Sequence, residues 1–185
     1  MLEDVKKEHR KKMEKAVSDL AHAFGTIRTG RASLSLLDGI EAEAYGTKMP
    51  LIQLASLNTP DARTIAIQPF DPNQIGGIEK AIRASNLGVN PTNDGRVIRL
   101  TIPQLTEERR KDLVKLAHRY AEEHRVAIRQ VRHHLIDEIK KLEKDKKISE
   151  DERRRETDEG QKMTDGYIEK VDAELAKKEA EIMEV

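Results

Sequence analysis

Apolar residues recur at steps of three and four along the N-terminal part of the chain. In residues 13–27 these positions are Met13, Val17, Leu20, Phe24 and Ile27. This spacing places one apolar stripe along one side of a helix. Gly30 follows shortly afterwards, between Arg28 and Arg31, and we expect it to end the first helix as a left-handed cap.

Two further segments show the same helical period. The second opens at Thr106, which can cap a helix that continues to about Lys146. The third opens at Ser149, which can form a capping box with Glu152. Their apolar stripes are Leu113, Ala117, Tyr120, His124, Ala127 and Val131, and then Thr164, Ile168, Val171, Leu175 and Ile182. Because an isolated stripe has nowhere to be buried, the three helices predict an antiparallel three-helix bundle. Within the third helix, Gly160 and Gly166 each reduce stability by about 1 kcal/mol relative to Ala.

The block between the first and second helices has a different pattern of apolar and polar residues. "IEAEAYG" and "RTIAIQPF" show the alternating or continuous apolar patterns of strands. "IGGIEKAIRAS" presents Ile75, Ile78 and Ile82 on one helical face. Asn-Asp-Gly at 93–95 predicts a hairpin turn before a strand over 97–102. These elements indicate a small mixed α/β unit.

The two sequence patterns together predict an α+β fold with two domains. Residues 1–29 and 105–185 form the three-helix bundle, and residues 30–104 form a β/α/β domain inserted into it. The chain leaves the bundle at Gly30 and returns at Pro103-Gln104. Two single connections lying side by side make a natural hinge.

Composition narrows the classes of function. Charged residues make up 37% of the chain and aromatic residues 3%, which suits long amphipathic helices better than a sandwich. The absence of cysteine excludes disulfides, thiolate metal sites and cysteine nucleophiles. The N-terminal sequence lacks the apolar run of a secretory signal, and no stretch approaches a membrane span, so we expect a cytoplasmic protein.

The net charge of zero conceals a segregation of charge. Residues 105–147 carry thirteen basic and nine acidic residues, a net charge of +4, whereas residues 148–185 carry seven and thirteen, a net charge of −6. Within the basic segment, four arginines share one face. Counted from Arg110, they lie at about 40° for Arg132, 60° for Arg125 and 100° for Arg129, while the predicted stripe centres near 300°.

This row of arginines has two interpretations. A planar guanidinium fork suits phosphate oxygens, and a rigid row could follow a nucleic-acid backbone. Alternatively, the arginines pair with the acidic third helix, as is usual on the flank of a charge-rich bundle. No aromatic side chains are interleaved with the arginines, so binding would depend on shape rather than on base stacking.

The sequence offers no signature of catalysis. His118, His124, His133 and His134 lie on one predicted helix, but His133 and His134 point about 100° apart and cannot chelate together. Phosphate loops, nucleophile elbows and dinucleotide fingerprints are absent. We therefore expect no metal, no cofactor and no enzymatic activity.

Several motifs resemble those of the bacterial ribosome recycling factor family. They are "IRTGRASLSLLDGI", "QLASL", "IQPFD", "IEKAIRASNLGVNPTNDGRVIRLTIPQLTEERRKDLVK", "RVAIRQVR" and "KDKKISEDE". The likeness covers the whole chain in the same order. It implies an L-shaped, hinged monomer that binds the post-termination ribosome. With elongation factor G and GTP, such a factor splits the ribosome into subunits and releases mRNA and tRNA, while hydrolysing nothing itself.

The resemblance also implies roles for individual residues. The contacts to large-subunit ribosomal RNA fall on Arg110, Arg129 and Arg132, with Arg125 nearby. The hinge falls on Gly30, Arg31, Gln104 and Leu105. The sequence departs from the family pattern at three places, where Pro is frequent at 34 and 104 and Arg-Asp at 133–134. Here they are Leu34, Gln104 and His133-His134.

A coiled-coil scaffold or chaperone adaptor is the alternative from another functional class. It would tolerate neutralisation of the arginine row, and it gives no role to a domain inserted through two short connections.

Overall fold

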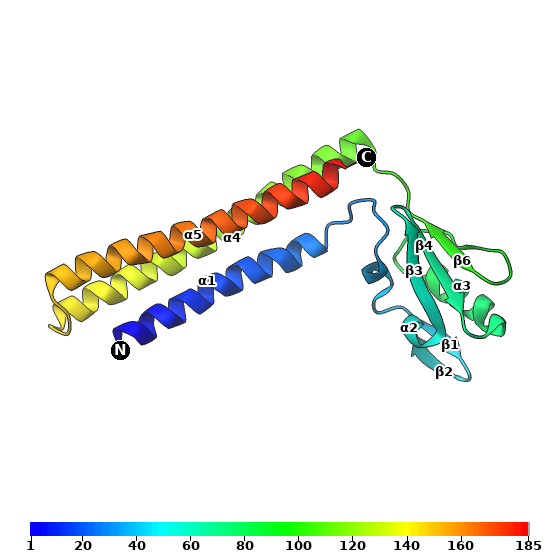
Figure 1. The fold of residues 1–185 in the computed structure, drawn as a ribbon, viewed down its shortest axis with the longest axis horizontal. Helices are drawn as coiled ribbons and strands as arrows, with labels where there is room; N and C mark the ends of the chain where they lie inside the picture. The colour runs from blue at the N-terminus through cyan, green and yellow to red at the C-terminus, as the bar shows by residue number, and fades with distance from the viewer. Residues whose placement is uncertain (185) are drawn as a thin grey trace. The chain divides into compact units, whose positions relative to one another are not determined.

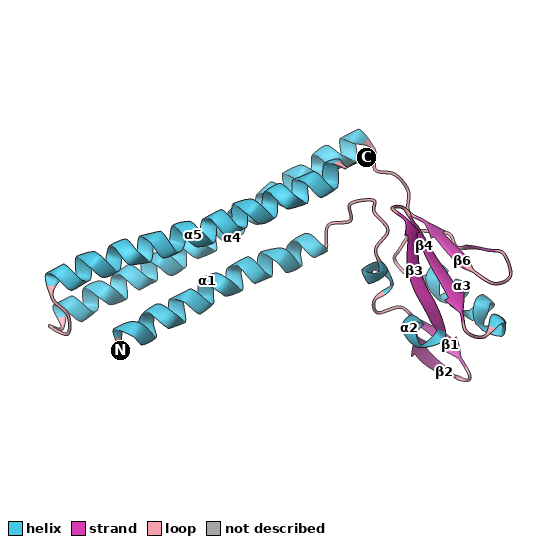
Figure 2. Ribbon diagram, in the orientation of Figure 1, coloured by secondary structure: helices cyan, strands magenta, loops and turns pink. Residues whose placement is uncertain are grey.

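The computed structural model describes residues 1–184. The chain divides into two compact units, which we describe separately. Met1–Arg28 and the chain from Glu107 onward form the first unit, and Thr29–Thr106 forms the second. Helices build the first unit, whereas the second combines strands with short helices (Figures 1 and 2).

Three long helices lie side by side in the first unit (Figure 1). They are α1 (Leu2–Gly25), α4 (Glu107–Lys144) and α5 (Glu150–Met183). A short turn joins α4 to α5, and the N-terminus of α1 lies at the same end of the bundle as this turn. Helix α4 therefore runs antiparallel to both α1 and α5, as predicted for the bundle.

The buried stripe of α4 differs from the predicted one. Tyr120, His124, Ala127 and Val131 are only half-buried. The fully buried positions are Ala117, Ala121, Ile128, Leu135 and Ile139. Counted from Arg110, this stripe centres near 0° rather than the predicted 300°. Because α4 packs against two helices, its buried arc lies between them, and a pattern read from α4 alone located only one flank of it.

The first helix ends earlier than predicted. It stops at Gly25, with Thr26 at its C-cap in the right-handed region, so the expected left-handed cap at Gly30 is wrong. The Thr26 hydroxyl donates a hydrogen bond of 2.6 Å to the Ala23 carbonyl, an alternative to continuing the helix. Ile27 is nevertheless buried beyond the helix end. At the start of α5, the predicted capping box between Ser149 and Glu152 is confirmed.

The contact between α4 and α5 depends on a small residue. Gly160 is buried in α5, and a Cβ atom there would lie 3.1 Å from Leu135 Cδ2 of α4. Gly166, further along the same helix, faces open space. Gly160 therefore does more than weaken the helix, since it lets α4 approach closely.

The second unit is built on antiparallel strands. Its main sheet has the order β3 (Ala55–Asp61), β4 (Thr64–Pro69), β6 (Ile98–Thr101) and β5 (Thr92–Asn93). A separate hairpin pairs β1 (Glu41–Ala44) with β2 (Thr47–Pro50). The helices are α2 (Leu51–Leu54) and α3 (Ile75–Ala84), with 3-10 turns at Leu34–Leu37 and Pro72–Gln74. One core joins α3 to the sheet through Ile65, Ile67, Ile78, Ile82, Ile98 and Leu100.

The predicted hairpin turn at 93–95 is confirmed between β5 and β6. The Asp94 carboxylate accepts hydrogen bonds from the backbone N–H groups of Val97 and Arg96 and from the Arg99 guanidinium. The bond from Val97, followed by those from Arg99 and Arg96, holds the pKa of Asp94 well below its usual range. Gly95 takes the left-handed conformation that the turn requires, with φ of +87°.

The two chain connections run side by side within the second unit. Gly30 has φ of +75°, and a Cβ atom there would lie 3.1 Å from Leu105 Cγ and 3.6 Å from the Pro103 carbonyl oxygen. Two features therefore favour glycine at position 30: the backbone there is left-handed, and the second connection lies close to where a Cβ atom would be.

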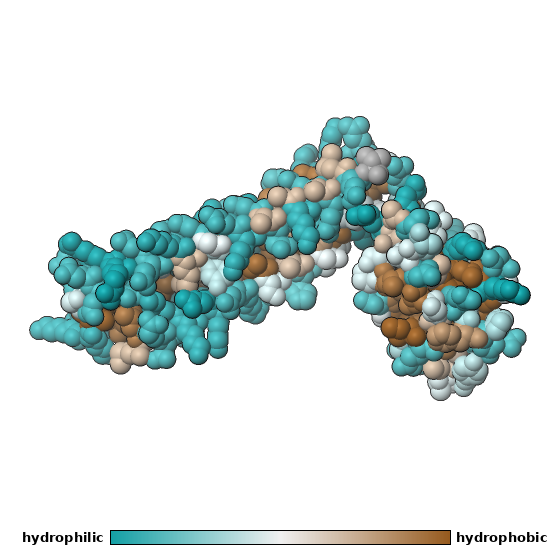
Figure 3. All heavy atoms as spheres, in the orientation of Figure 1, coloured by the Kyte–Doolittle hydropathy of each residue, from teal (hydrophilic) through white to brown (hydrophobic). Residues whose placement is uncertain are grey.

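Surface character differs between the two units. The visible face of the three helices is largely hydrophilic (Figure 3). Exposed large apolar side chains occur in both units: Leu34, Tyr45, Ile52 and Phe70 in the smaller second unit, and Met1, Val126 and Met183 in the helical one. None of the helices within residues 1–184 combines the length and apolar character needed to cross a membrane.

Replacing Gly166 by Ala should stabilise the protein by about 0.5–1 kcal/mol, because the added Cβ meets open space on a helix. Gly160→Ala should gain less, since Leu135 must shift to make room for the methyl group. Urea denaturation of the two variants compares them directly. A larger gain at Gly160 than at Gly166 would contradict the close packing of α4 on α5.

Gly30→Ala should destabilise the protein by about 2 kcal/mol, because it combines left-handed strain with a contact to Leu105. Gly39→Ala is the matched control. Gly39 has φ of +77° but open space around it, so the same change there should cost only about 1 kcal/mol. Thermal unfolding measures both variants, and equal losses would show that the contact with Leu105 carries no energy.

Candidate nucleic-acid interface

The four arginines of α4 lie closer to its buried stripe than the sequence predicted. The stripe centres close to the direction of Arg110, and Arg132, Arg125 and Arg129 lie about 40–100° to one side of it, on the flank from which Arg125 and Arg132 reach α5. Arg125 is only 18% exposed and Arg129 is 47% exposed. Arg110 and Arg132 are half-buried. Their partners on α4 and α5 therefore decide what each arginine can do.

Arg125 is held by carboxylates. Its Nε and one terminal nitrogen donate to Asp172 Oδ1 at 2.8 and 2.6 Å, and the other terminal nitrogen donates to Glu122 at 3.1 Å. Burial alone would lower the pKa of Arg125, but the bonds to Asp172 and Glu122 outweigh it and raise the pKa. The charge of this arginine is balanced by two half-exposed carboxylates at the surface of the bundle.

Arg129 shares Glu122 with Arg125. Its terminal nitrogen lies 2.8 Å from the other carboxylate oxygen of Glu122. The bonds from Arg129 and then Arg125 lower the pKa of Glu122. Because Glu122 and Arg129 are both about half exposed, water screens this pair and its net strength is small. Arg129 can therefore exchange Glu122 for another anion.

Arg132 and Arg110 have no carboxylate partner among residues 1–184. Arg132 donates to the amide oxygen of Gln161 at 3.0 Å, and its Nε is buried without an acceptor. Arg110 also has a buried Nε without an acceptor, and it forms no hydrogen bond or ion pair within the described chain. These two guanidinium groups keep an uncompensated positive charge.

The structure brings only some of the predicted residues together. Glu122 joins Arg125 to Arg129, and Arg132 follows one turn later. Arg110 lies about 22 Å along the axis from Arg125. The contacts of Arg125 thus agree with the interpretation that the arginines pair with acidic residues. Arg110 and Arg132 make no ion pair within residues 1–184, as phosphate binding requires.

Three residues of this flank were not predicted from the sequence: Glu122, Gln161 and Asp172. The spacing of Glu122 from Arg125 is i, i+3 and could have been recognised. Gln161 and Asp172 lie on α5, and their partners depend on how far α5 is displaced along α4. The sequence contains no local signal for that displacement.

Three of the four histidines of α4 have separate polar partners. His118 pairs with Glu179 of α5, His133 Nε2 lies 3.4 Å from Asp137, and His124 Nδ1 donates to the Tyr120 carbonyl at 2.7 Å. Within residues 1–184, no group of three or more acidic or histidine side chains is arranged to hold a metal ion.

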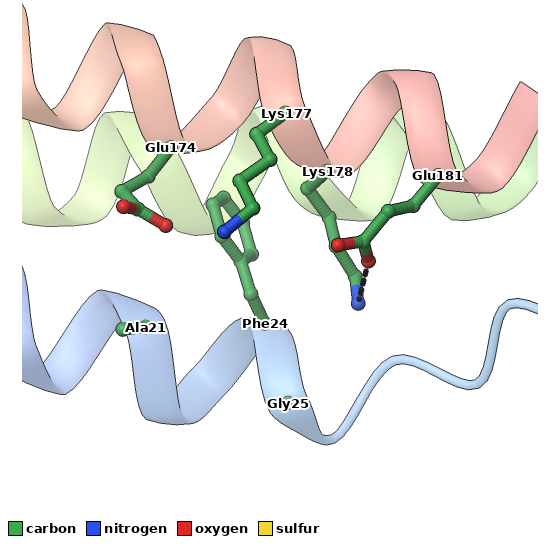
Figure 4. Close-up of a pocket in the computed structure, with 7 residues that line it drawn as sticks. All are labelled: Ala21, Phe24, Gly25, Glu174, Lys177, Lys178 and Glu181. Atoms are coloured by element: carbon green, nitrogen blue, oxygen red, sulfur yellow. Dashed lines mark hydrogen bonds and ion pairs between the residues drawn. The ribbon is translucent and has the colours of Figure 1, made fainter. Parts of the chain in front are cut away.

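A groove lies between α1 and α5 (Figure 4). Its lining residues are Ala21, Phe24, Gly25, Glu174, Lys177, Lys178 and Glu181. Lys178 Nζ lies 3.2 Å from Glu181, and Phe24 is buried at the floor. Two carboxylates and two ammonium groups balance one another here, and the lining includes no serine, threonine, cysteine or histidine. The groove does not favour a catalytic site.

Comparison with known proteins gives one consistent result. The family model described as ribosome recycling factor matches residues 20–183. A ribosome-recycling factor of Rubrobacter xylanophilus is 52% identical over 175 residues, covering 95% of this chain and 94% of the relative. One from Halothermothrix orenii is 51% identical and covers both chains completely.

Solved structures agree with the sequence relatives. The solution structure of a ribosome recycling factor has a TM-score of 0.76 and 46% identity, covering 100% of this chain and 98% of that one. A Thermus thermophilus ribosome recycling factor has a TM-score of 0.64 and 47% identity, with complete coverage of both chains. That factor is described together with Escherichia coli elongation factor G, bound to the post-termination complex. The family match, the full-length identity and the shared fold together show that this chain belongs to the ribosome recycling factor family.

Proposed function

We propose that this chain splits post-termination ribosomes into subunits together with elongation factor G and GTP, and thereby releases mRNA and tRNA. The observation that supports this most strongly is the relative described with elongation factor G on the post-termination complex, which is 47% identical over the full length of both chains. In this function the chain binds and moves, and the associated GTPase supplies the energy. The factor itself needs no catalytic residue.

The flank of α4 provides the contact with large-subunit ribosomal RNA in this proposal. Arg110 and Arg132 contribute most, because neither has to leave a carboxylate before it meets a phosphate. Arg129 contributes by exchanging the exposed Glu122 for RNA. Arg125 has the smallest direct role, since two bonds to Asp172 hold it against α5. This order refines the set of four arginines chosen from the sequence.

The connections at Gly30-Arg31 and Gln104-Leu105 form the hinge in this proposal. They join domain 1–29 with 105–185 to the inserted domain 30–104. Two features support a hinge here: each connection is a single strand of chain, and the two lie so close that a Cβ atom at position 30 would lie 3.1 Å from Leu105 Cγ. A change at one connection therefore affects the other directly.

The full-length family match weighs against the alternative of a scaffold or chaperone adaptor. A scaffold also leaves the uncompensated charges of Arg110 and Arg132 without a use.

Sedimentation of post-termination ribosomes tests the proposed function. With this protein, elongation factor G and GTP, the ribosome peak should convert into separate subunit peaks in a sucrose gradient. Omitting any one component, or replacing GTP with a non-hydrolysable analogue, should leave the ribosome peak intact. Persistence of that peak with all components present would refute the function.

Arg132→Ala and Arg110→Ala should each weaken binding to ribosomes about tenfold or more, because a charge-assisted contact contributes about 1.5–3 kcal/mol. Arg125→Ala should weaken binding less while lowering the melting temperature, since it leaves Asp172 unpaired. Filter binding and circular dichroism measure the two effects separately.

Arg119→Ala is the matched control, because Arg119 lies on the same helix about 180° from Arg110 and is exposed. Equal losses for Arg119 and Arg132 would show that general charge, not this flank, determines affinity.

A further inference from the structure

Arg132 is held in place by a neighbour that leaves its charge intact. One terminal nitrogen donates to Gln161 Oε1 at 3.0 Å, across the contact between α4 and α5. No carboxylate within residues 1–184 lies at ion-pair distance from Arg132. The buried Nε shows that the stem of this side chain lies against the bundle, so only its far end can turn outward.

A second hydrogen bond determines which way Gln161 faces. Its amide Nε2 donates to Asp165 Oδ1 at 2.7 Å, one turn further along α5. An amide has one donor end and one acceptor end. Because Asp165 takes the donor end, the acceptor end must face Arg132. Asp165 thus acts on the arginine through the glutamine.

The contrast with Arg125 shows what this arrangement achieves. Both arginines lie on the same flank of α4 and reach α5. Arg125 meets the carboxylate of Asp172 at 2.6 Å, which balances its charge. Arg132 meets a neutral amide, which restricts its rotamers without balancing its charge. The same contact surface therefore contains one neutralised arginine and one oriented, still charged arginine.

We propose that Gln161, oriented by Asp165, is a positioning residue that aims the charged guanidinium of Arg132 at an anionic ligand of the phosphate class. This inference rests on the proposed function, in which that ligand is the backbone of ribosomal RNA. The neutrality of residue 161 is the essential property, because a carboxylate at this position would turn Arg132 into a second Arg125.

Binding to purified large ribosomal subunits at several salt concentrations tests the proposal. Gln161→Glu should weaken binding about tenfold. It should also reduce the slope of log affinity against log salt by about 0.7–0.9, the value for one lost phosphate contact. The melting temperature should change little, because the new carboxylate gains an ion pair with Arg132 but loses the hydrogen bond to Asp165 and meets its like charge. Gln161→Met keeps the charge of Arg132 but loses its anchor, so it should weaken binding about threefold with an unchanged slope.

Two controls make the result specific. Gln130→Glu adds the same charge to α4 on the side away from this flank, about 200° from Arg110, and should leave affinity and slope unchanged. Adding Gln161→Met to Arg132→Ala should cause no further loss, since the residue that Gln161 positions is already gone.

The outcomes separate this proposal from the proposed function. If Gln161→Glu folds normally and binds with normal affinity and slope, Gln161 is merely structural and the proposal is wrong. If Gln130→Glu weakens binding equally, the effect is one of overall charge and the proposal is again wrong. If Arg132→Ala itself binds normally, the proposed contact between Arg132 and ribosomal RNA is wrong, and the positioning role of Gln161 is wrong with it. Loss in Arg132→Ala and in Gln161→Glu, with normal binding by Gln130→Glu, supports the positioning role.

Discussion

The mutual burial of three narrow apolar stripes is the constraint on which the rest of this structure depends. None of the long helices can bury its own stripe, so each is stable only against the other two. At one end of the bundle, Lys6 of α1 lies 2.7 Å from Glu156 and 2.8 Å from Glu159 of α5. These carboxylates raise the pKa of Lys6, and Glu156 is almost fully buried. The pair links α1 to α5 at a defined position, since either charge alone would be costly to bury.

The same close packing creates the candidate site. Gly160 lets α5 approach Leu135 of α4, and this brings the polar residues of α5 within reach of the arginines. Asp172 then balances Arg125, whereas Gln161 contacts Arg132 without balancing it. In this highly charged bundle, some arginines therefore stabilise the fold, whereas others remain able to bind an external anion. The difference arises from which α5 side chain lies opposite each arginine, because the four guanidinium groups are chemically identical.

The second unit follows different rules. Its core is made by aliphatic side chains of the four-stranded sheet and α3, joined by residues of β1, α2 and the first 3-10 turn. Asp94 and Gly95 were recognisable in advance because a hairpin turn has strong local requirements. The approach of Leu105 to Gly30 was not, because it joins residues 75 positions apart in sequence. A glycine predicted as a helix cap proved instead to be the point where the two connections meet.

The sequence by itself determined the kind and order of the elements, because helical period, capping residues and turn residues act over a few neighbouring positions. The three helices, the capping box at Ser149, the hairpin at 93–95 and the arginine row could all be recognised in this way. Only the tertiary structure decided the centre of the buried stripe on α4 and the partners of each arginine. Both depend on how α1 and α5 pack around α4. Asp172 and Gln161 are 47 and 29 residues from the arginines they contact. Local periodicity carries no information about the rotation and displacement of one helix on another, which are determined by side-chain packing over the whole bundle.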